Sequence, residues 1–573
     1  MFNKVYKSGV LIAFLILISR LFYLQVVKGA YFYDLSINNY LRILPLPGFR
    51  GNILDRYGRE IAGNKLSFCI QILPDKVKDK KSVFGMLSQD LGLDINVLQE
   101  NYKKGFRAVF QPVKVAEDIP KDKAIYLKEK YRQVPGVMVE EEVKRVYPYE
   151  NLCSHVLGYL GQLSQQELME LKPYGYRFHS LIGKSGIEKF YEPYLKGNDG
   201  GMLVKVDNQG RIKEILGKQS PTRGLDVYLT LDLDLQKKAE QILGEERGCI
   251  MVMDVHTGEL LVMVSHPNFD PNVFLELDES KISHYLSSWD HPLYNRCIQA
   301  VYPLGSIFKL VTATAGLESG ILSSTTRFKC PGYFEFGGRR YRCWKKEGHG
   351  WQNMGEAITH SCNVYFYQAG LKVGWKNIIS YARIYGLGNR TGIDLPYENK
   401  GLLPTPEWKL KIKGEQWYPG DTVNLSIGQG YLLVTPIQVL RFIAVIANGG
   451  YLVTPHICKA ISGESTGKHL PQKLSVKNST LKFLRRAMYA VVNSPTGTGQ
   501  LARLRGIKIA GKTATAQNPS GRPHAWFVGF APYTDPEIAF LFFVENGGGG
   551  GFVTARMAKE FLEYYFRHKG KEL

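Results

Sequence analysis

Two side chains with the spacing of a nucleophile and its base stand at the start of an apolar run. Ser306 and Lys309 lie in the sequence SIFK, which follows the residues YPLG at 302–305 and precedes the run LVTATA at 310–315. Turn residues followed by an apolar run predict that a helix starts here. Residues three positions apart share a helix face, so the Lys309 amine is expected beside the Ser306 hydroxyl. Ser306 is therefore a candidate nucleophile and Lys309 its candidate base.

A helix start at this point would also favour the chemistry. Unpaired backbone N–H groups and the helix dipole stabilise the negative charge that develops on an attacked carbonyl. A neutral Lys309 could accept the serine proton if burial and neighbouring positive charge lower its pKa.

Two later segments supply further polar side chains. Ser361 and Asn363 lie in SCN, 361 − 306 = 55 residues after Ser306, and KTAT begins at Lys512, another 512 − 361 = 151 residues on. A set of Ser-x-x-Lys, Ser-x-Asn and Lys-Thr-Gly-like segments in this order is far more specific than any one of them. We therefore expect the three segments to form one site.

A second Ser-x-x-Lys occurrence begins at Ser465, where GESTG at 463–467 also matches the nucleophile elbow GxSxG. Its surroundings, residues 461–472, are mostly polar and Pro471 follows closely. The elbow requires a strand, a turn and a helix, and no helix is expected to begin at Ser465. We interpret this segment as a surface loop.

Four residues with soft metal-ligand side chains fall within 33 positions: Cys330, Cys343, His349 and Cys362. Three Cys and one His form a tetrahedral structural zinc set, although the spacing lacks a CxxC pair. A disulfide such as Cys330 to Cys343, or free thiols, are alternatives that sequence does not separate. A metal here would support the Ser361–Asn363 segment from behind, because Cys362 lies within it.

The elements that must position these residues predict an α+β domain. Two apolar runs, 249–254 and 260–265, flank HTGE and read as a hairpin, and three strand-like runs follow at 506–517, 525–531 and 537–545. A stretch with helical period closes the chain at 554–568. A hairpin, a helical middle and three final strands predict an antiparallel sheet flanked by helices. We place the start of this domain at 226, just before a strand at 228–231 and a helix at 232–243, and its end at 573.

The preceding part is expected to be an anchor and an extended platform. Residues 9–27, GVLIAFLILISRLFYLQVV, are long enough to span a bilayer as one helix. Lys4 and Lys7 precede it, which predicts a cytoplasmic tail at 1–8 and the remaining chain outside. A cleaved signal peptide is the alternative, but no Ala-x-Ala site follows. Residues 28–225 are charge-rich, with a short strand-like run at 68–72 and a helical stretch at 121–133.

Composition excludes several classes of protein. The 573 residues carry 73 − 52 = +21 net charge, 44% hydrophobic residues and 8 Cys, which fits neither a disordered chain nor a disulfide scaffold. The excess positive charge favours an anionic neighbour such as lipid headgroups, wall polymer or nucleic acid. Basic residues are scattered, so no nucleic-acid surface is expected in a chain placed outside the membrane. Gly547–Gly551 is expected to be a flexible loop.

The chain resembles class B penicillin-binding proteins of the elongation type. Besides the three motifs, the resemblance rests on RGNILDRYG at 50–58, RVYP at 145–148, GIE at 186–188 and SIGQGY at 426–431. No glycosyltransferase domain fits within the first 220 residues, which argues against the bifunctional class A. The resemblance implies a peptidoglycan D,D-transpeptidase of cell-wall elongation and rod-shape maintenance in the bacterial inner membrane. It also implies reaction with β-lactams and no cofactor for catalysis.

The resemblance also implies a role for each motif residue. Ser306 would be acylated by the penultimate D-Ala of a D-Ala-D-Ala stem peptide, with Lys309 as base. Ser361 would relay protons near the leaving group, Asn363 would hold the substrate amide and Lys309, and Lys512 would complete the positive field. The substrate carboxylate would be held by Thr513 and Thr515, and the N–H groups of Ser306 and Thr515 would form the oxyanion hole. The implied partners are lipid-linked or nascent stem peptides and a SEDS-type membrane glycosyltransferase.

Three positions depart from the family pattern. Leu304 and Ile307 replace Pro and Thr around the nucleophile, where neither side chain takes part in the chemistry. Ala514 replaces Gly on a strand that is expected to take substrate as an added neighbour, so its methyl should hinder close approach. Two other functions remain to be weighed: a D,D-carboxypeptidase or β-lactamase-like hydrolase using the same serine, and a membrane-anchored sensor or scaffold. The long platform and anchor favour the transpeptidase.

Overall fold

The computed structural model describes residues 2–46, 48–106, 109, 112–176, 180–207, 212–465, 467, 470–518 and 521–570. Two compact units divide the chain. The first comprises Met1–Gly51, Gly63–Val146 and Lys196–Leu225, and the second Asn52–Ala62, Tyr147–Leu195 and Asp226–Leu573. The predicted domain bounds stay a prediction, because a division by compactness does not by itself define folding or functional domains.

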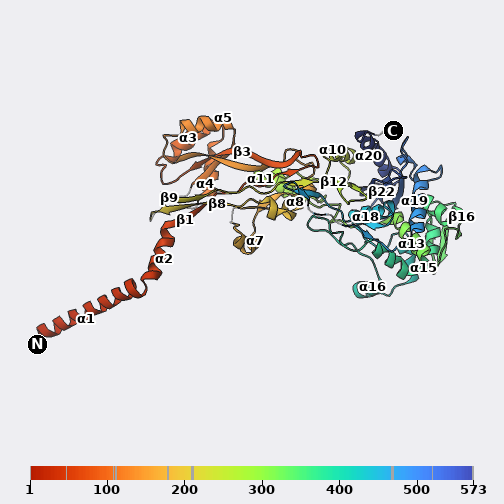
Figure 1. Ribbon diagram of the computed structural model, residues 1–573, viewed down its shortest axis with the longest axis horizontal. Coiled ribbons are helices and arrows are strands. Elements are labelled where there is room, and N and C mark those ends of the chain that lie inside the picture. Colours follow the sequence, from red (N-terminus) through yellow and green to blue (C-terminus); the bar gives the residue numbers. More distant parts are fainter. Residues whose placement is uncertain are drawn as a thin grey trace. The chain divides into compact units, whose positions relative to one another are not determined.

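The first unit begins with one long apolar helical segment (Figure 1). Helix α1 (Phe2–Phe22) continues through a π-helical turn (Tyr23–Val27) to α2 (Gly29–Tyr40). Residues Tyr6–Val27 are long and apolar enough to cross a membrane, with mean hydropathy 2.4. The guanidinium of Arg20 lies over the Tyr23 ring at 5.4 Å, near the end of the span, where an aromatic side chain suits a membrane interface. The segment fits a single-pass membrane anchor.

The rest of the first unit, in its described residues, has two groups of paired strands and three helices. Strand β8 (Gly200–Val206) pairs with β1 (Leu41–Leu46) and β9 (Ile212–Gln219). Strand β3 (Glu60–Ile72), from Gly63 on, pairs with β4 (Val113–Ile119) and β5 (Val137–Val146). Helices α3 (Lys80–Leu91), α4 (Ile95–Gly105) and α5 (Lys121–Lys130) complete the unit, and buried residues of β3, α3, α4 and α5 share one core. The strand expected at 68–72 is part of β3, and α5 covers residues 121–130 of the helix expected at 121–133.

A five-stranded antiparallel sheet forms the centre of the second unit. Its strand order is β12 (Leu260–His266), β11 (Gly248–Asp254), β23 (Ile538–Val544), β22 (His524–Ala531) and β21 (Ala510–Ala516). All residues of β22 and β23 are buried, because both faces of the sheet are covered. A strand buried on both faces reads as a continuous apolar run, which is why these strands were visible in the sequence. Strand β21 lies at an edge of the sheet.

Helices cover both faces of this sheet. Side chains of α10 (Leu233–Leu243) and α20 (Val553–His568) form a core with one face. Helices α13 (Lys309–Glu318), α15 (Asn363–Ile384), α18 (Pro436–Ala447) and α19 (Asn478–Asn493) contribute to the core on the other. Every residue of α18 is buried, so it is the central helix of this layer. The α+β class, with an antiparallel sheet flanked by helices, is confirmed.

Shorter elements complete the second unit. Strand β10 (Val227–Leu229) pairs with β2 (Ile53–Leu54) and β18 (Cys458–Ile461), and β19 (Glu464–Ser465) pairs with β18. The other paired strands are β6 (Leu160–Gln162) with β7 (Leu181–Gly183), β13 (Phe328–Cys330) with β16 (Gly350–Gln352), β14 (Tyr333–Phe336) with β15 (Arg339–Arg342), and β17 (Tyr451–Leu452) with β20 (Gln472–Lys473). The short helices are α6 (Ser154–Leu157), α7 (Gln165–Leu171), α8 (Gly186–Phe190), α9 (Glu192–Leu195), α11 (Asn272–Glu276), α12 (Glu279–Ser287), α14 (Met354–Thr359), α16 (Pro406–Lys413) and α17 (Pro419–Ser426), with 3₁₀ turns at Lys172–Tyr174, Gly305–Phe308 and Gln500–Ala502.

Candidate active site

Ser306 lies on a 3₁₀ turn, Gly305–Phe308, that leads directly into α13. The turn is held from one side by Gly428, whose carbonyl accepts the Gly305 N–H at 2.9 Å. A Cβ at Gly428 would stand 2.3 Å from the Gly305 carbonyl oxygen, and the φ of Gly428 is +73°. Only glycine fits such an approach, so SIGQG at 426–430 shapes the nucleophile turn. The sequence placed a helix start here, and the structure begins it with a tighter 3₁₀ turn.

Lys309 is fully buried at the first turn of α13. Its amine donates to the Ser361 carbonyl at 2.8 Å and to Asn363 Oδ1 at 2.6 Å, and lies 3.4 Å from Ser361 Oγ. Burial disfavours the charged ammonium and lowers the pKa of Lys309 to about 8. A substantial neutral fraction is therefore present near neutral pH, as a base requires.

Ser361 lies between two lysine amines. Its Oγ is 3.4 Å from the Lys309 amine and accepts from the Lys512 amine at 3.0 Å. Lys512 is the donor to this hydroxyl, whereas neutral Lys309 uses its two N–H groups in its shorter contacts and can accept the Ser361 hydroxyl hydrogen on its lone pair. Its φ of +53° is rare outside glycine and marks a constrained connection between α14 and α15. The geometry suits a hydroxyl that passes protons.

Lys512 reaches this point from edge strand β21. The side chain is fully buried, and the amine also donates to the Thr513 carbonyl at 2.9 Å. Burial, together with the charge of Lys309, lowers the pKa of Lys512. The structure thus brings together Lys309, Ser361, Asn363 and Lys512, four of the five predicted catalytic residues, by direct hydrogen bonds. Ser306 joins them through the 3₁₀ turn, which packs against β21.

The two predicted carboxylate-binding threonines also lie on β21. Thr513 is buried and its Oγ1 lies 2.8 Å from Thr498 Oγ1, while the exposed Thr515 accepts the Gly550 N–H at 3.4 Å. A Cβ at Gly550 would be 2.3 Å from the Ala514 carbonyl oxygen. The glycine run at 547–551 therefore packs closely over β21 at this point, which the expectation of a flexible loop did not foresee.

Ala514 does not present its methyl to the open edge of β21. The residue is 2% exposed, and its Cβ lies 3.5 Å from the point that a Cβ on Gly305 would occupy. The methyl therefore packs toward the nucleophile turn inside the protein. The expectation that it hinders an added strand is not supported by this placement.

The competing serine, Ser465, lies on the short strand β19 and is exposed. Its expected neighbours in the motif, Thr466 and Lys468, lie outside the described residues. A short exposed strand at Ser465 is not the buried strand leading into a helix that a nucleophile elbow requires.

The four residues of the Cys/His cluster converge as the sequence suggested. Cys330, Cys343, His349 and Cys362 each offer one ligand atom, and these atoms all lie within 4.8 Å of one another. His349 Nδ1 is 3.6 Å from the Cys330 sulfur and 3.5 Å from the Cys343 sulfur. In a tetrahedral zinc site with bonds of about 2.3 Å to sulfur and about 2.0 Å to nitrogen, such atoms stand about 3.5 Å apart. All eight cysteines are described and none forms a disulfide.

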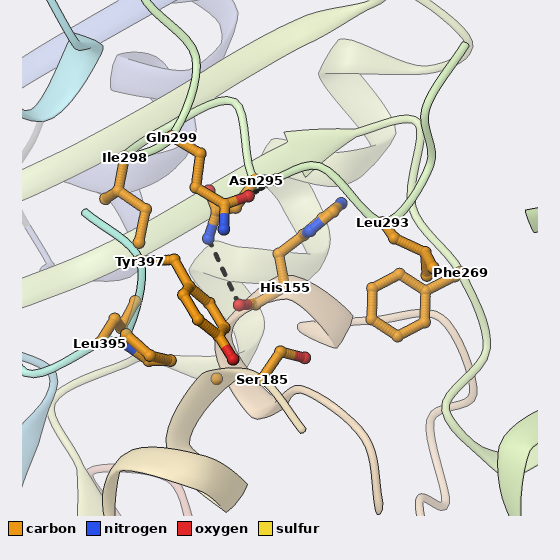
Figure 2. Close-up of a pocket in the computed structure, with 11 residues that line it drawn as sticks. His155, Ser185, Phe269, Leu293, Asn295, Ile298, Gln299, Leu395 and Tyr397 are labelled. Carbon is orange, nitrogen blue, oxygen red and sulfur yellow. Dashed lines mark hydrogen bonds between the residues drawn. The ribbon is translucent and has the colours of Figure 1, made fainter. Parts of the chain in front are cut away.

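One small hollow elsewhere in the second unit is unrelated to the motif residues. It is lined by His155, Asn295 and Tyr397, among others, and Figure 2 shows the Asn295 amide directed at the main-chain carbonyl of His155. Its volume of about 20 Å³ accommodates about one water molecule. Burial lowers the pKa of His155 to about 4, so the ring is neutral and donates from Nε2 to the Pro267 carbonyl. These contacts are structural.

Several residues around the site could not be identified from the sequence. Gly428 was noted only within a family-like stretch, and no pattern in the sequence pointed to Thr498, Thr496 or His360. The last two are hydrogen-bonded to each other, His360 Nε2 to Thr496 Oγ1, at 2.9 Å. The position of His360 directly before Ser361 is the one signal that could have drawn attention to it.

Comparisons with known proteins agree with this geometry. Residues 248–563 match the penicillin binding protein transpeptidase domain, and residues 45–229 match the penicillin-binding protein dimerisation domain. The chain is 37% identical over 588 residues to peptidoglycan D,D-transpeptidase MrdA of Acinetobacter baumannii, covering 98% of this chain and 87% of that protein.

Two solved structures are also similar. One is the complex between penicillin-binding protein PBP2 and MreC from Helicobacter pylori, with a TM-score of 0.81 and 33% identity, covering 92% of this chain and 99% of that one. The other is a peptidoglycan synthase complex that coordinates polymerization and crosslinking, with a TM-score of 0.75, 30% identity and 98% of each chain covered. The transpeptidase model alone spans more than half of the chain, so the chain belongs to the penicillin-binding proteins, with relatives of the MrdA and PBP2 type.

Proposed function

We propose that this chain is a peptidoglycan D,D-transpeptidase that cross-links stem peptides through an acyl-enzyme on Ser306. The observation that carries the proposal is the convergence of two buried lysine amines, Lys309 and Lys512, on Ser361 beside the turn that holds Ser306. Relatives that match nearly the whole chain carry the same activity in their names. The anchor-like helix and the long first unit favour a transpeptidase over a soluble hydrolase.

In the first half of the reaction, neutral Lys309 takes the proton of Ser306, whose oxygen attacks the penultimate D-Ala carbonyl. The N–H groups of Ser306 and Thr515 hold the resulting oxyanion. When the tetrahedral intermediate collapses, the peptide bond breaks, and the departing D-Ala nitrogen receives a proton through Ser361. The terminal carboxylate is held by Thr513, Thr515 and the positive field of Lys512.

In the second half, the amine of a neighbouring stem peptide attacks the acyl-enzyme carbonyl. The amine loses a proton to the same lysine–serine pair, the new peptide bond forms, and Ser306 is released with its proton restored. Because a β-lactam carbonyl also acylates the serine but leaves no departing group that diffuses away, β-lactams give a long-lived adduct on Ser306.

The chain is further proposed to act in the bacterial cytoplasmic membrane. Lys4 and Lys7 favour a cytoplasmic N-terminus, with residues 28–573 outside. Its substrates are lipid-linked or nascent stem peptides, and its partner is a SEDS-type membrane glycosyltransferase of the elongation complex. One solved relative comes from a peptidoglycan synthase complex and another is bound to MreC, which supports an assembly of this kind.

A direct test is reconstitution with nascent peptidoglycan made in the same reaction. The products are digested to muropeptides and identified by mass spectrometry. Cross-linked dimers that disappear in Ser306→Ala support the transpeptidase. Release of D-Ala without dimers would assign a carboxypeptidase instead, and dimers formed equally by Ser306→Ala would contradict the assignment of Ser306.

We also propose that the Cys/His cluster holds a structural zinc ion. Cys330, Cys343, His349 and Cys362 fit the tetrahedral ligand set by residue type and by their mutual distances. The ion would supply no chemistry to the reaction and would fix the segment from Cys330 to His349 behind the Ser361–Asn363 segment. Cys362 also caps α15, because its sulfur accepts the Tyr365 N–H at 3.4 Å.

Metal analysis of the purified protein tests this site. We expect about one zinc ion per chain, lost in Cys343→Ser but retained in Cys458→Ser, a buried cysteine outside the cluster. Absence of metal, with a mass two hydrogens lower than that of the reduced chain, would identify a disulfide. Eight alkylatable thiols without metal would show that the cysteines are free.

A further inference from the structure

We infer that His360 is a positioning residue for the transpeptidase site. Its side chain ties the segment that carries Ser361 to the loop at 494–499 through Thr496, and this tie sets the placement of Thr498 and of its partner Thr513. The inference rests on the proposed function, because Thr513 matters only if β21 receives the substrate carboxylate.

The direction of each hydrogen bond follows from Gln352. Its Nε2 donates to the main-chain carbonyls of His349 at 2.9 Å and Trp351 at 3.1 Å, so its Oε1 is the atom that faces His360. Gln352 Oε1 lies 2.6 Å from His360 Nδ1, and an amide oxygen only accepts, so Nδ1 carries the hydrogen. In the neutral ring Nε2 is then an acceptor, and Thr496 donates to it at 2.9 Å.

The loop that receives this bond is short and firmly seated. It runs from the end of α19 to the 3₁₀ turn at Gln500, and a Cβ on Gly497 would stand 2.2 Å from the Val491 carbonyl oxygen. Two residues after Thr496, Thr498 places its Oγ1 2.8 Å from Thr513 Oγ1. Because the loop has little freedom, a displacement of Thr496 must move Thr498 and with it the hydroxyl environment of Thr513.

The Cys/His cluster supports His360 from the other side. The rings of His360 and His349 are parallel, 4° apart with centroids at 5.8 Å, and Trp344 Nε1 donates to the His360 carbonyl at 3.0 Å. Gln352, which fixes the ring tautomer, belongs to β16, the partner strand of Cys330. The segment from Cys330 to Gln352, which holds three of the four candidate metal ligands, therefore orients His360, and His360 orients the loop before β21.

The hydrogen bond between His360 and Thr496 links the two parts of the chain that meet at Ser361. Lys512 approaches Ser361 Oγ from β21, while His360 precedes Ser361 along the chain and reaches toward the loop that leads to β21. Among the described residues His360 makes no hydrogen bond to Lys309 or Lys512, so it acts through Thr496 and not on the reacting atoms. Its loss should therefore weaken recognition of the carboxylate more than the acylation step.

The test uses the acylation kinetics of the full-length protein with a carboxylate-bearing labelled penicillin. Thr496→Val keeps the side-chain shape and removes the donor on the exposed side of the pair. We expect the half-saturating penicillin concentration to rise about tenfold, equivalent to about 1.4 kcal/mol, while the limiting acylation rate stays within about twofold. Thr496→Ser keeps the hydroxyl and should restore the wild-type value. In a His360→Phe background, Thr496→Val should have no further effect.

Each contrary result has a distinct meaning. Unchanged half-saturation in Thr496→Val, a loss confined to the limiting rate, or additive effects of the two substitutions would overturn the inference. Equal melting temperatures of wild type and Thr496→Val exclude unfolding as the cause, even if His360→Phe is unstable. If wild type itself forms no adduct on Ser306, the proposed function fails, and the role of His360 fails with it.

Discussion

The acylation rate should depend on pH in a way set by the burial of Lys309. The side chain is fully buried, which lowers its pKa from the usual 10.5 to about 8. That change corresponds to about 3.4 kcal/mol against the charged form. The protonated amine cannot accept the Ser306 proton, so the rate follows the neutral fraction, which rises as pH increases through the pKa.

The expected profile has a rise and a plateau. With a pKa of about 8, the neutral fraction is about 1% at pH 6, about 50% at pH 8 and about 90% at pH 9. Acylation by labelled penicillin should therefore accelerate about 50-fold from pH 6 to 8 and only about twofold from pH 8 to 9. A lysine with the ordinary pKa would give a further tenfold over the last step.

Stopped-flow or quenched acylation, followed by quantification of the adduct, gives this profile. A rate that climbs tenfold between pH 8 and 9 would show that the pKa of Lys309 is not lowered. A flat profile from pH 6 to 8 would show that Lys309 is not the base. Lys309→Ala serves as control: it should lose acylation at every pH while its thermal unfolding remains cooperative. Normal acylation in that variant would refute the role assigned to Lys309.

Three substitutions test the surrounding structure. Gly428→Ala should slow acylation at least tenfold, because its Cβ would lie 2.3 Å from the Gly305 carbonyl oxygen. The control Gly430→Ala, also at positive φ but with its nearest contact at 3.4 Å, should slow acylation less. Equal effects of the two substitutions would show that backbone strain alone is responsible. Ala514→Gly should change acylation less than about threefold by the same assay, since the methyl is buried; a tenfold gain would mean that the methyl obstructs substrate. Phe540→Ala should lower the free energy of unfolding by about 3–5 kcal/mol, measured by denaturant titration, because a fully buried aromatic leaves a cavity; a loss below about 1 kcal/mol would contradict this packing.

The parts of the fold with a strong local signal could be predicted from the sequence. Strands such as β22 and β23 are continuous apolar runs because both faces are covered, and α10 is marked by Asp232, whose side chain accepts from two N–H groups of the first turn. The expected helix at Ser306 began as a 3₁₀ turn, since Gly428 holds the preceding residue from a distant part of the chain. Such a tertiary contact leaves no periodic trace in the sequence.

The motif residues of the site were predictable, but their environment was not. Lys309, Ser361, Asn363 and Lys512 could be chosen by residue type and order, and the structure joins them by hydrogen bonds. The burial of Ala514 could not be predicted from the sequence, because the face of the sheet on which its methyl lies depends on the register of strand β21. The bond between His360 and Thr496 joins residues 136 apart and has no local signature.

Mapping the acyl adduct tests the central claim most directly. The purified full-length protein is incubated with labelled penicillin, and intact mass and peptide mapping locate the label over time. We predict one stable adduct per chain on Ser306 that is absent in Ser306→Ala. A label on another residue such as Ser465, an adduct that persists in Ser306→Ala, or no adduct at all would contradict the assignment of Ser306 as the nucleophile.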